Sequence, residues 1–104
     1  MYGLIGKMLA NPGQRDALIE ILTRNLADAP MPGCLSYILA KDPEDENAIW
    51  ITEVWDSKTS HEASLALPSV KKAIAAGRPL IAGFGSRFIT TPVGGYGLSS
   101  ASER

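Results

Sequence analysis

The sequence contains very little of the two residue types that most often build reactive or metal-binding sites. It has one cysteine, Cys34, and one histidine, His61, among 104 residues. A single cysteine excludes a disulfide within the chain and fits a reducing compartment. Because no histidine is near Cys34 in the sequence, its thiol is expected to pack as a small hydrophobe and not to act as a nucleophile.

Basic runs and long hydrophobic runs are also missing. The ten lysines and arginines are scattered, and the formal net charge is −1. This balance argues against nucleic acid or an anionic membrane as a partner. The first residues, MYGLIGKMLANPG, lack a positively charged leader, and no later stretch could span a bilayer. We therefore expect a cytoplasmic protein. The acidic run DPEDE has no matching ligand set, so it predicts a solvated turn and no metal site.

What is present is an ordinary globular composition, with 45% hydrophobic and 20% charged residues. Four β-rich runs lie between turn residues and predict strands: Tyr2–Ala10, CLSYILA (34–40), AIWITEVW (48–55) and SRFITT (86–91). The stretch RPLIAGFG before the last of them is expected to be irregular. Alternation in the second run places Leu35, Tyr37 and Leu39 on one side and Cys34, Ser36 and Ile38 on the other.

Two helical regions separate these strands. Before the first, Asn11 is expected to cap the helix, Pro12 to take its first position and Gln14 to reach back as in a capping box. The second is expected to open at Asp56 and Ser57, to break at Pro68 and to resume as SVKKAIAA until Gly77 ends it.

The resulting order, β–α–β–β–α–β, is that of the ferredoxin-like split βαβ fold. This α+β architecture has four antiparallel strands with two helices on one face. The domain is expected to span residues 1–92, and the Gly/Ser-rich remainder, 93–104, is expected to be a flexible tail.

The run AIWITEVW is apolar on both of its sides. Trp50 and Val54 point one way, and Ile49, Ile51 and Trp55 point the other. Two helices can cover only one face of the sheet, so the second face needs another cover. At about 25 cal/mol per Å², a sheet face of about 800 Å² is too much apolar surface to leave in water. The sequence therefore predicts a homodimer that packs through the sheet face.

Several stretches together resemble the antibiotic biosynthesis monooxygenase family. They are PGQRDALIEIL, PGCLSYILA, an acidic turn, and ITEVWDSKTSHEASLALPSVKKA, in that order over about residues 2–92. The resemblance implies a dimeric α+β barrel. It also implies a cofactor-independent oxygenase that acts with O₂ on a small aromatic or quinol-like substrate, because a deprotonated, electron-rich aromatic can itself pass an electron to O₂.

The chain departs from the family pattern at two positions. Where many members carry histidines, Ser64 and Ser69 stand here, and the positions used by haem-degrading relatives fall near Gly6, Ser64 and Ala75. Two alternatives therefore stay open beside the oxygenase. One is a non-catalytic small-molecule binding dimer, and the other is an isomerase of a small signalling ligand on the same scaffold.

His61 and Glu53 are the candidate catalytic residues. An imidazole is the usual general base at neutral pH, although His61 could equally be a surface residue near a helix start. Glu53 lies within an apolar strand, which favours a proton acceptor, a partner for Arg87 or a hydrogen bond across the dimer seam. The candidate substrate-binding residues are aromatic or cationic, and each could instead belong to the core or the surface: Tyr37, Trp50, Trp55, Phe84 and Arg87.

Overall fold

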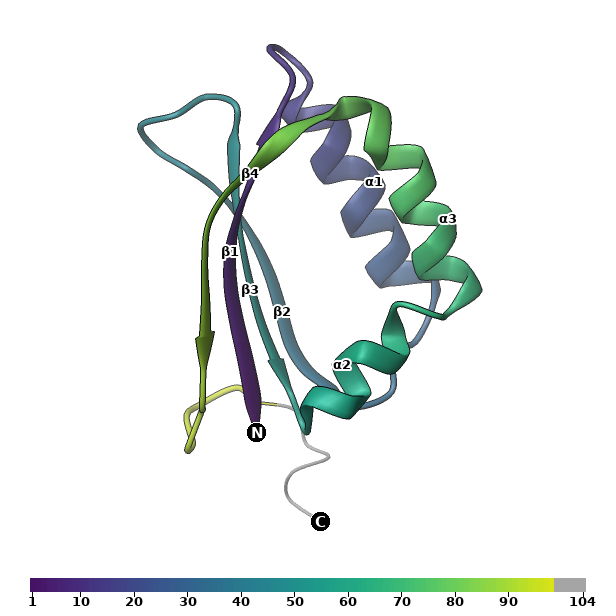
Figure 1. The fold of residues 1–104 in the computed structure, drawn as a ribbon, viewed down its shortest axis with the longest axis vertical. Coiled ribbons are helices and arrows are strands. Elements are labelled where there is room, and N and C mark those ends of the chain that lie inside the picture. The colour runs from purple at the N-terminus through teal and green to yellow at the C-terminus, as the bar shows by residue number, and fades with distance from the viewer. Residues whose placement is uncertain (99–104) are drawn as a thin grey trace.

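The computed structural model describes residues 1–98 as one sheet with a layer of helices against it (Figure 1). The antiparallel sheet has the order β2-β3-β1-β4 and consists of β1 (Tyr2–Ala10), β2 (Cys34–Lys41), β3 (Ala48–Trp55) and β4 (Ile81–Thr90). The helices are α1 (Arg15–Asp28), α2 (Lys58–Ser64), α3 (Pro68–Gly77) and the 3₁₀ turn η1 (Arg78–Leu80). This confirms the predicted ferredoxin-like α+β fold. No described helix is long and apolar enough to cross a membrane.

The core lies between the helices and the inner face of the sheet. On β3, the alternation of side chains turns Ile49, Ile51 and Trp55 toward the helices, where all three are buried. Leu18 of α1 is fully buried against Ile49 and Ile51 in the same cluster. The two sides that alternation predicts for AIWITEVW are therefore confirmed.

The outer face of the sheet has no helix over it in the part of the chain from residue 1 to residue 98 (Figure 1). The strand registers place Ile38, Thr52, Ile5 and Phe88 in one row across all four strands. Ile38 and Phe88, at the two edges of this row, are 55% and 54% exposed. An apolar row thus crosses the uncovered face from edge to edge.

The predicted start of the first helix is wrong. The helix begins at Arg15, its N-cap is Gln14, and the Gln14 side chain makes no capping hydrogen bond. Asn11 does not cap α1, because its side-chain amide donates to the carbonyl oxygen of Pro79 at 2.9 Å. Asn11 therefore ties the end of β1 to η1, so that a contact between distant segments replaces the local cap.

The interruption of the second helical region is confirmed. Ser57 caps α2 by accepting a hydrogen bond from the backbone N–H of Ser60 at 3.1 Å. Pro68 occupies the first turn of α3, where a missing N–H has no cost, so the chain changes direction between α2 and α3.

Two strand details differ from the sequence predictions. The last strand is longer than SRFITT, because β4 already begins at Ile81 and includes most of the stretch expected to be irregular. The pairing of β2 with β3 shifts by one residue between Cys34 and Ser36, so Cys34 stands opposite Trp55. This bulge breaks the simple alternation and brings Cys34 to the same side of the sheet as Tyr37. The last part of the predicted tail, residues 99–104, lies outside the described residues.

Candidate active site

His61 of α2 and Glu53 of β3 face each other on the inner side of the sheet. The His61 Nε2 atom lies 3.8 Å from the Glu53 Oε1 atom, and each side chain is only 15% exposed. This separation is too long for a direct hydrogen bond but suits an ion pair when the imidazole carries a proton. The arrangement can therefore accept a proton on His61 and stabilise the resulting charge with Glu53.

Trp55 fixes the position of the Glu53 carboxylate. Its indole N–H donates to Glu53 Oε1 at 2.9 Å, and the ring itself is almost completely buried. The same ring meets His61 edge-on, with ring centroids 5.4 Å apart, and Tyr2 lies 5.8 Å from His61 on a tilted plane. Two aromatic rings thus pack against the imidazole, and they account for part of its low exposure to water.

The start of α2 is held against the beginning of β2, and this contact places His61. The backbone N–H of Asp56 donates to the Gly33 carbonyl oxygen at 2.8 Å. Gly33 has φ of +87°, and a Cβ atom there would lie 2.5 Å from the Cβ of Ser60. Only glycine fits this position, because it needs both a left-handed backbone and the close approach of the helix.

Two further polar groups lie beside Glu53 on β2. Tyr37 pairs with Glu53 across the strands, and burial, with an addition from the Glu53 charge, raises the pKa of the Tyr37 phenol well above its ordinary value. Burial also raises the pKa of the Cys34 thiol, and the Glu53 charge again adds to the shift. Both groups therefore stay protonated at neutral pH, so Tyr37 can donate a hydrogen bond but Cys34 is a poor nucleophile.

The structure divides the other predicted site residues between separate places. Trp55 and Tyr37 lie beside the His61–Glu53 pair, whereas Trp50 points to the outer face, where its indole N–H donates to Asp42 at 2.9 Å. Phe84 of β4 is 71% exposed. Arg87 of β4 stands opposite Gly6, and no ion pair with Glu53 exists within residues 1–98.

The two serines at the family's histidine positions have different surroundings. Ser64 is buried, and its hydroxyl donates to the carbonyl oxygen of His61 at 2.6 Å, which stabilises the turn of α2 that carries the imidazole. Ser69, in contrast, faces a cleft between α1 and α3. Ser64 therefore supports the site through the backbone, and its signal in the sequence is only its position one turn after His61.

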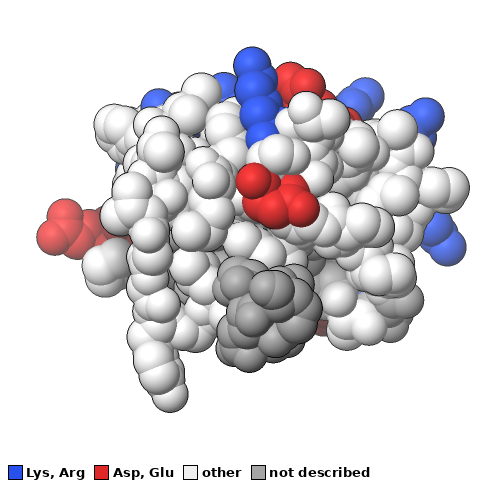
Figure 2. All heavy atoms as spheres, turned by 90° about the horizontal axis from the view of Figure 1, so that it is seen from below, with Lys and Arg blue, Asp and Glu red and all other residues white. Residues whose placement is uncertain are grey.

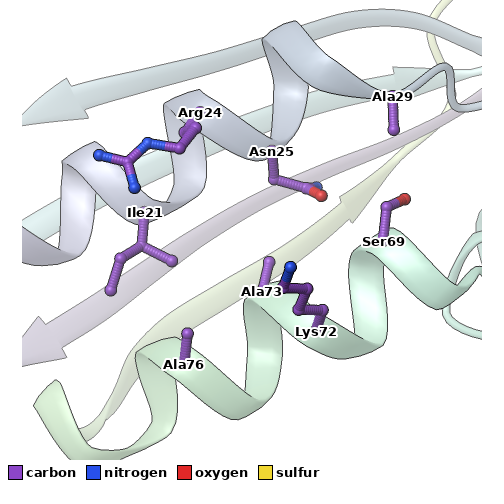
Figure 3. A pocket seen from close by; sticks show the side chains of 8 residues that line it. All are labelled: Ile21, Arg24, Asn25, Ala29, Ser69, Lys72, Ala73 and Ala76. Atoms are coloured by element: carbon purple, nitrogen blue, oxygen red, sulfur yellow. The ribbon is translucent and has the colours of Figure 1, made fainter.

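The cleft between α1 and α3 has a volume of about 350 Å³ and does not include His61 or Glu53 (Figure 3). Side chains from the two helices point toward each other across it: Ile21, Arg24, Asn25, Ala29, Ser69, Lys72, Ala73 and Ala76. Sequence reasoning did not identify this cleft. Its one signal was Asn25, a polar residue in the otherwise apolar stripe of α1.

The charges near the His61 end of the molecule are sparse. Figure 2 shows the end that carries the N-terminus and α2, and most of this face is neither acidic nor basic. Among the described side chains, which exclude Asp28 and residues 99–104, no group of three or more His, Cys, Asp or Glu gathers in a way that could hold a metal ion.

Comparison with known proteins assigns a family to this architecture. Residues 1–76 match the model of the antibiotic biosynthesis monooxygenase family. A solved structure of a proposed antibiotic biosynthesis monooxygenase from Chloroflexus aurantiacus is 64% identical, with a TM-score of 0.88, and the match covers 94% of this chain and 98% of that chain.

Two more distant structures show the fold alone. A protein from Deinococcus radiodurans, also described as a proposed antibiotic biosynthesis monooxygenase, is 24% identical, covers 96% of this chain and 100% of its own, and has a TM-score of 0.74. One from Caulobacter crescentus with the same description is 23% identical, covers 86% and 84%, and has a TM-score of 0.73. No curated protein gave a significant match. The family model and the 64% identical structure together establish that this chain belongs to the antibiotic biosynthesis monooxygenase family.

Proposed function

We propose that this protein is a cofactor-independent monooxygenase that oxidises a small aromatic or quinol-like substrate with O₂. The observation that supports this function is the His61–Glu53 pair, 3.8 Å apart and enclosed by the rings of Trp55 and Tyr2. Such a site can remove a phenolic proton in surroundings that exclude most water.

His61 is the general base in this proposal. Its imidazole takes the phenolic proton, and the Glu53 carboxylate, held by the Trp55 indole, stabilises the imidazolium that forms. The electron-rich anion passes one electron to O₂, and the two radicals combine at a ring carbon. For an anthrone-type CH₂ group, one oxygen atom becomes the carbonyl and the other leaves as water with both hydrogens. Tyr37 stays protonated and can donate to the anionic oxygen of the substrate.

The decisive experiment measures oxygen uptake with a panel of quinols and anthrones and no added metal. His61→Ala is expected to lower kcat by about a hundredfold or more, because a general base contributes about 10²–10⁴ to a rate. Glu53→Gln keeps the side-chain shape but removes the charge, so a fall of about tenfold is expected, equivalent to about 1.4 kcal/mol. Glu44→Gln, in the exposed loop before β3, is the matched control and should leave uptake unchanged.

The other two functions give different results in the same assay. Flat oxygen traces together with ligand-dependent thermal stabilisation would identify a non-catalytic binder. Product formation without oxygen consumption would identify an isomerase. Oxygen uptake that survives His61→Ala unchanged would remove the imidazole from the proposed mechanism.

We also propose that the protein works as a homodimer joined through the outer face of the sheet. The row formed by Ile38, Thr52, Ile5 and Phe88 supports this assembly, because three of its four side chains are apolar and no described helix covers it. A second copy packed on this row would form the dimeric α+β barrel that the family resemblance implies.

A further inference from the structure

The inner face of β1 has an unoccupied position at Gly6. Gly6 pairs with Ile51 on one side and with Arg87 on the other. Ile51 is part of the buried core, so Gly6 also faces the helical layer. A Cβ atom built on Gly6 would meet no heavy atom within 4 Å. The centre of the inner face is therefore open above the backbone of β1.

No contact among the described residues requires glycine at this position. At Gly3 a Cβ atom would lie 2.1 Å from the Thr90 hydroxyl, and at Gly85 it would lie 3.0 Å from Lys7, but Gly6 has no such neighbour. Its backbone is also outside the left-handed region. A glycine inside a strand lowers stability by about 0.5–1 kcal/mol relative to alanine. Glycine at position 6 therefore lowers the stability of the fold, and no contact among the described residues compensates for this loss.

The opening at Gly6 lies between groups of opposite charge. Glu53 stands opposite Leu4, which makes it the diagonal neighbour of Gly6, at a Cβ spacing of about 7–8 Å for such pairs. Arg87, directly opposite Gly6 on β4, is exposed, and it makes no ion pair with any of the described side chains, which exclude Asp28 and residues 99–104. A molecule over Gly6 thus has the Glu53–His61 pair on one side and a guanidinium on the other.

Apolar side chains flank the open position at Gly6. Leu4 and Met8, two positions before and after Gly6, turn apolar side chains to the same face, and Ile51 bounds the β3 side. A glycine inside a strand often marks a place where a ligand approaches the backbone closely, and a planar ring is a ligand that such a bare backbone can accept. The position above Gly6 is therefore lined by apolar side chains, with the Glu53–His61 pair on the β3 side and Arg87 on the β4 side.

We propose that Gly6 determines substrate size and shape by leaving room for a planar aromatic ring against the β1 backbone. The substrate carries an oxygen at each end of the ring: one faces the Glu53–His61 pair and the other is bound by Arg87. This inference rests on the proposed function for the identity of the reacting end. It does not follow from that function, because a base at His61 would act equally with a bulky residue at position 6.

The test measures binding without turnover. Calorimetric titration with 1,4-dihydroxynaphthalene under nitrogen excludes the oxygen reaction, so affinity is read alone. Gly6→Leu is expected to lower affinity at least tenfold, and Gly6→Ala less. Gly94→Leu is the control: a Cβ there also meets nothing within 4 Å, but Gly94 is exposed and follows β4, outside the sheet. Wild-type affinity in Gly6→Leu would overturn the inference.

A second variant tests the two-ended recognition. Arg87→Gln is expected to weaken 1,4-dihydroxynaphthalene severalfold and to leave 1-naphthol, which has one oxygen, unchanged. An equal loss for both ligands would show that Arg87 does not bind the second oxygen.

If binding depends on Gly6 but no oxygen is consumed in air, the proposed function fails and this inference stands. If oxygen uptake is intact but Gly6→Leu changes nothing, only this inference fails. No binding by the wild type overturns the inference directly.

Discussion

Single residues in this protein have roles that depend on the side of the sheet they occupy. Glu53 is a carboxylate between Ile51 and Trp55 on the inner face, and it stays there because the Trp55 indole and His61 provide polar partners. These partners offset the cost of placing a carboxylate against the core. Trp50, five positions before Trp55, lies on the opposite face, and its indole N–H donates a hydrogen bond to Asp42 instead.

The Cys34 thiol should react slowly. Because its pKa is raised by burial and by the Glu53 charge, the thiolate fraction at pH 8 is lower than in a free cysteine. Iodoacetamide should therefore label Cys34 more slowly in the native protein than in urea, and the native rate should keep rising above pH 9. Glu53→Gln removes one cause of the shift and should increase the native rate at pH 8. Equal native and unfolded rates would contradict this account.

Elements are positioned here by a few close backbone contacts. Gly33 at the entry to β2 touches the start of α2, and Asn11 at the end of β1 holds η1. Arg15 at the first turn of α1 donates to the carbonyl oxygens of Asp42, Asp45 and Ala48, which fixes the loop between β2 and β3. The helices are thus attached to the sheet at their ends, and the first residues of α2 carry the attachment that matters for His61.

Gly33→Ala should destabilise the protein and displace α2. The substitution combines a positive φ with a Cβ atom 2.5 Å from Ser60, whereas Gly13→Ala has a positive φ but open space. We expect Gly13→Ala to cost about 1 kcal/mol and Gly33→Ala at least about 1–2 kcal/mol more in urea unfolding. Oxygen uptake should fall only in Gly33→Ala. Equal costs for the two variants would show that the contact with α2 is not tight.

The sequence predicts the elements well where the pattern is local. Strands 2–10 and 48–55 and the break at Pro68 follow from alternation and from proline chemistry. The early start of β4 could not be seen, because Gly83 and Gly85 dilute its pattern while β1 provides the pairing partner. The side occupied by Cys34 depends on a bulge, and the role of Asn11 depends on Pro79, far away in the chain.

Part of the site could be predicted as well. Residue type and position in the sequence make His61 and Glu53 catalytic candidates, but their close approach depends on how α2 returns over β3, which no local pattern specifies. Alternation already separates Trp50 from Trp55, so only one of the two could ever line an inner pocket. The open space at Gly6 cannot be predicted from the sequence, because it depends on where the side chains of the helices lie in the folded structure.

At the scale of the whole molecule, the proposed homodimer depends on the outer face of the sheet, which no described helix covers. Edge strands β2 and β4 carry exposed Ile38 and Phe88, and such an apolar row would make a solitary protomer prone to association. Sedimentation at micromolar concentration should therefore give twice the protomer mass of 11.1 kDa.

Phe88→Glu is expected to shift this equilibrium toward the protomer by at least tenfold in the dissociation constant, because it places a charge in the apolar row. Leu65→Glu is the control: Leu65 is 49% exposed but lies at the end of α2, away from the outer face. A wild-type protein that sediments as a folded protomer would refute the proposed assembly.

The outer face is not uniform along its length. Toward the end of β1, the Lys7 Nζ atom lies 3.7 Å from Asp42 Oδ2 and 5.7 Å from the centre of the Trp50 ring. This end of the outer face therefore carries charges, whereas the row that contains Ile5 is mainly apolar. In the proposed dimer, a shift of one copy along the other would place apolar side chains over Lys7 or Asp42. Such a shift removes water from these charged groups, and this desolvation costs free energy. The uneven distribution of charged and apolar side chains on the outer face therefore favours one relative position of the two copies, because other positions bury a charge against an apolar side chain.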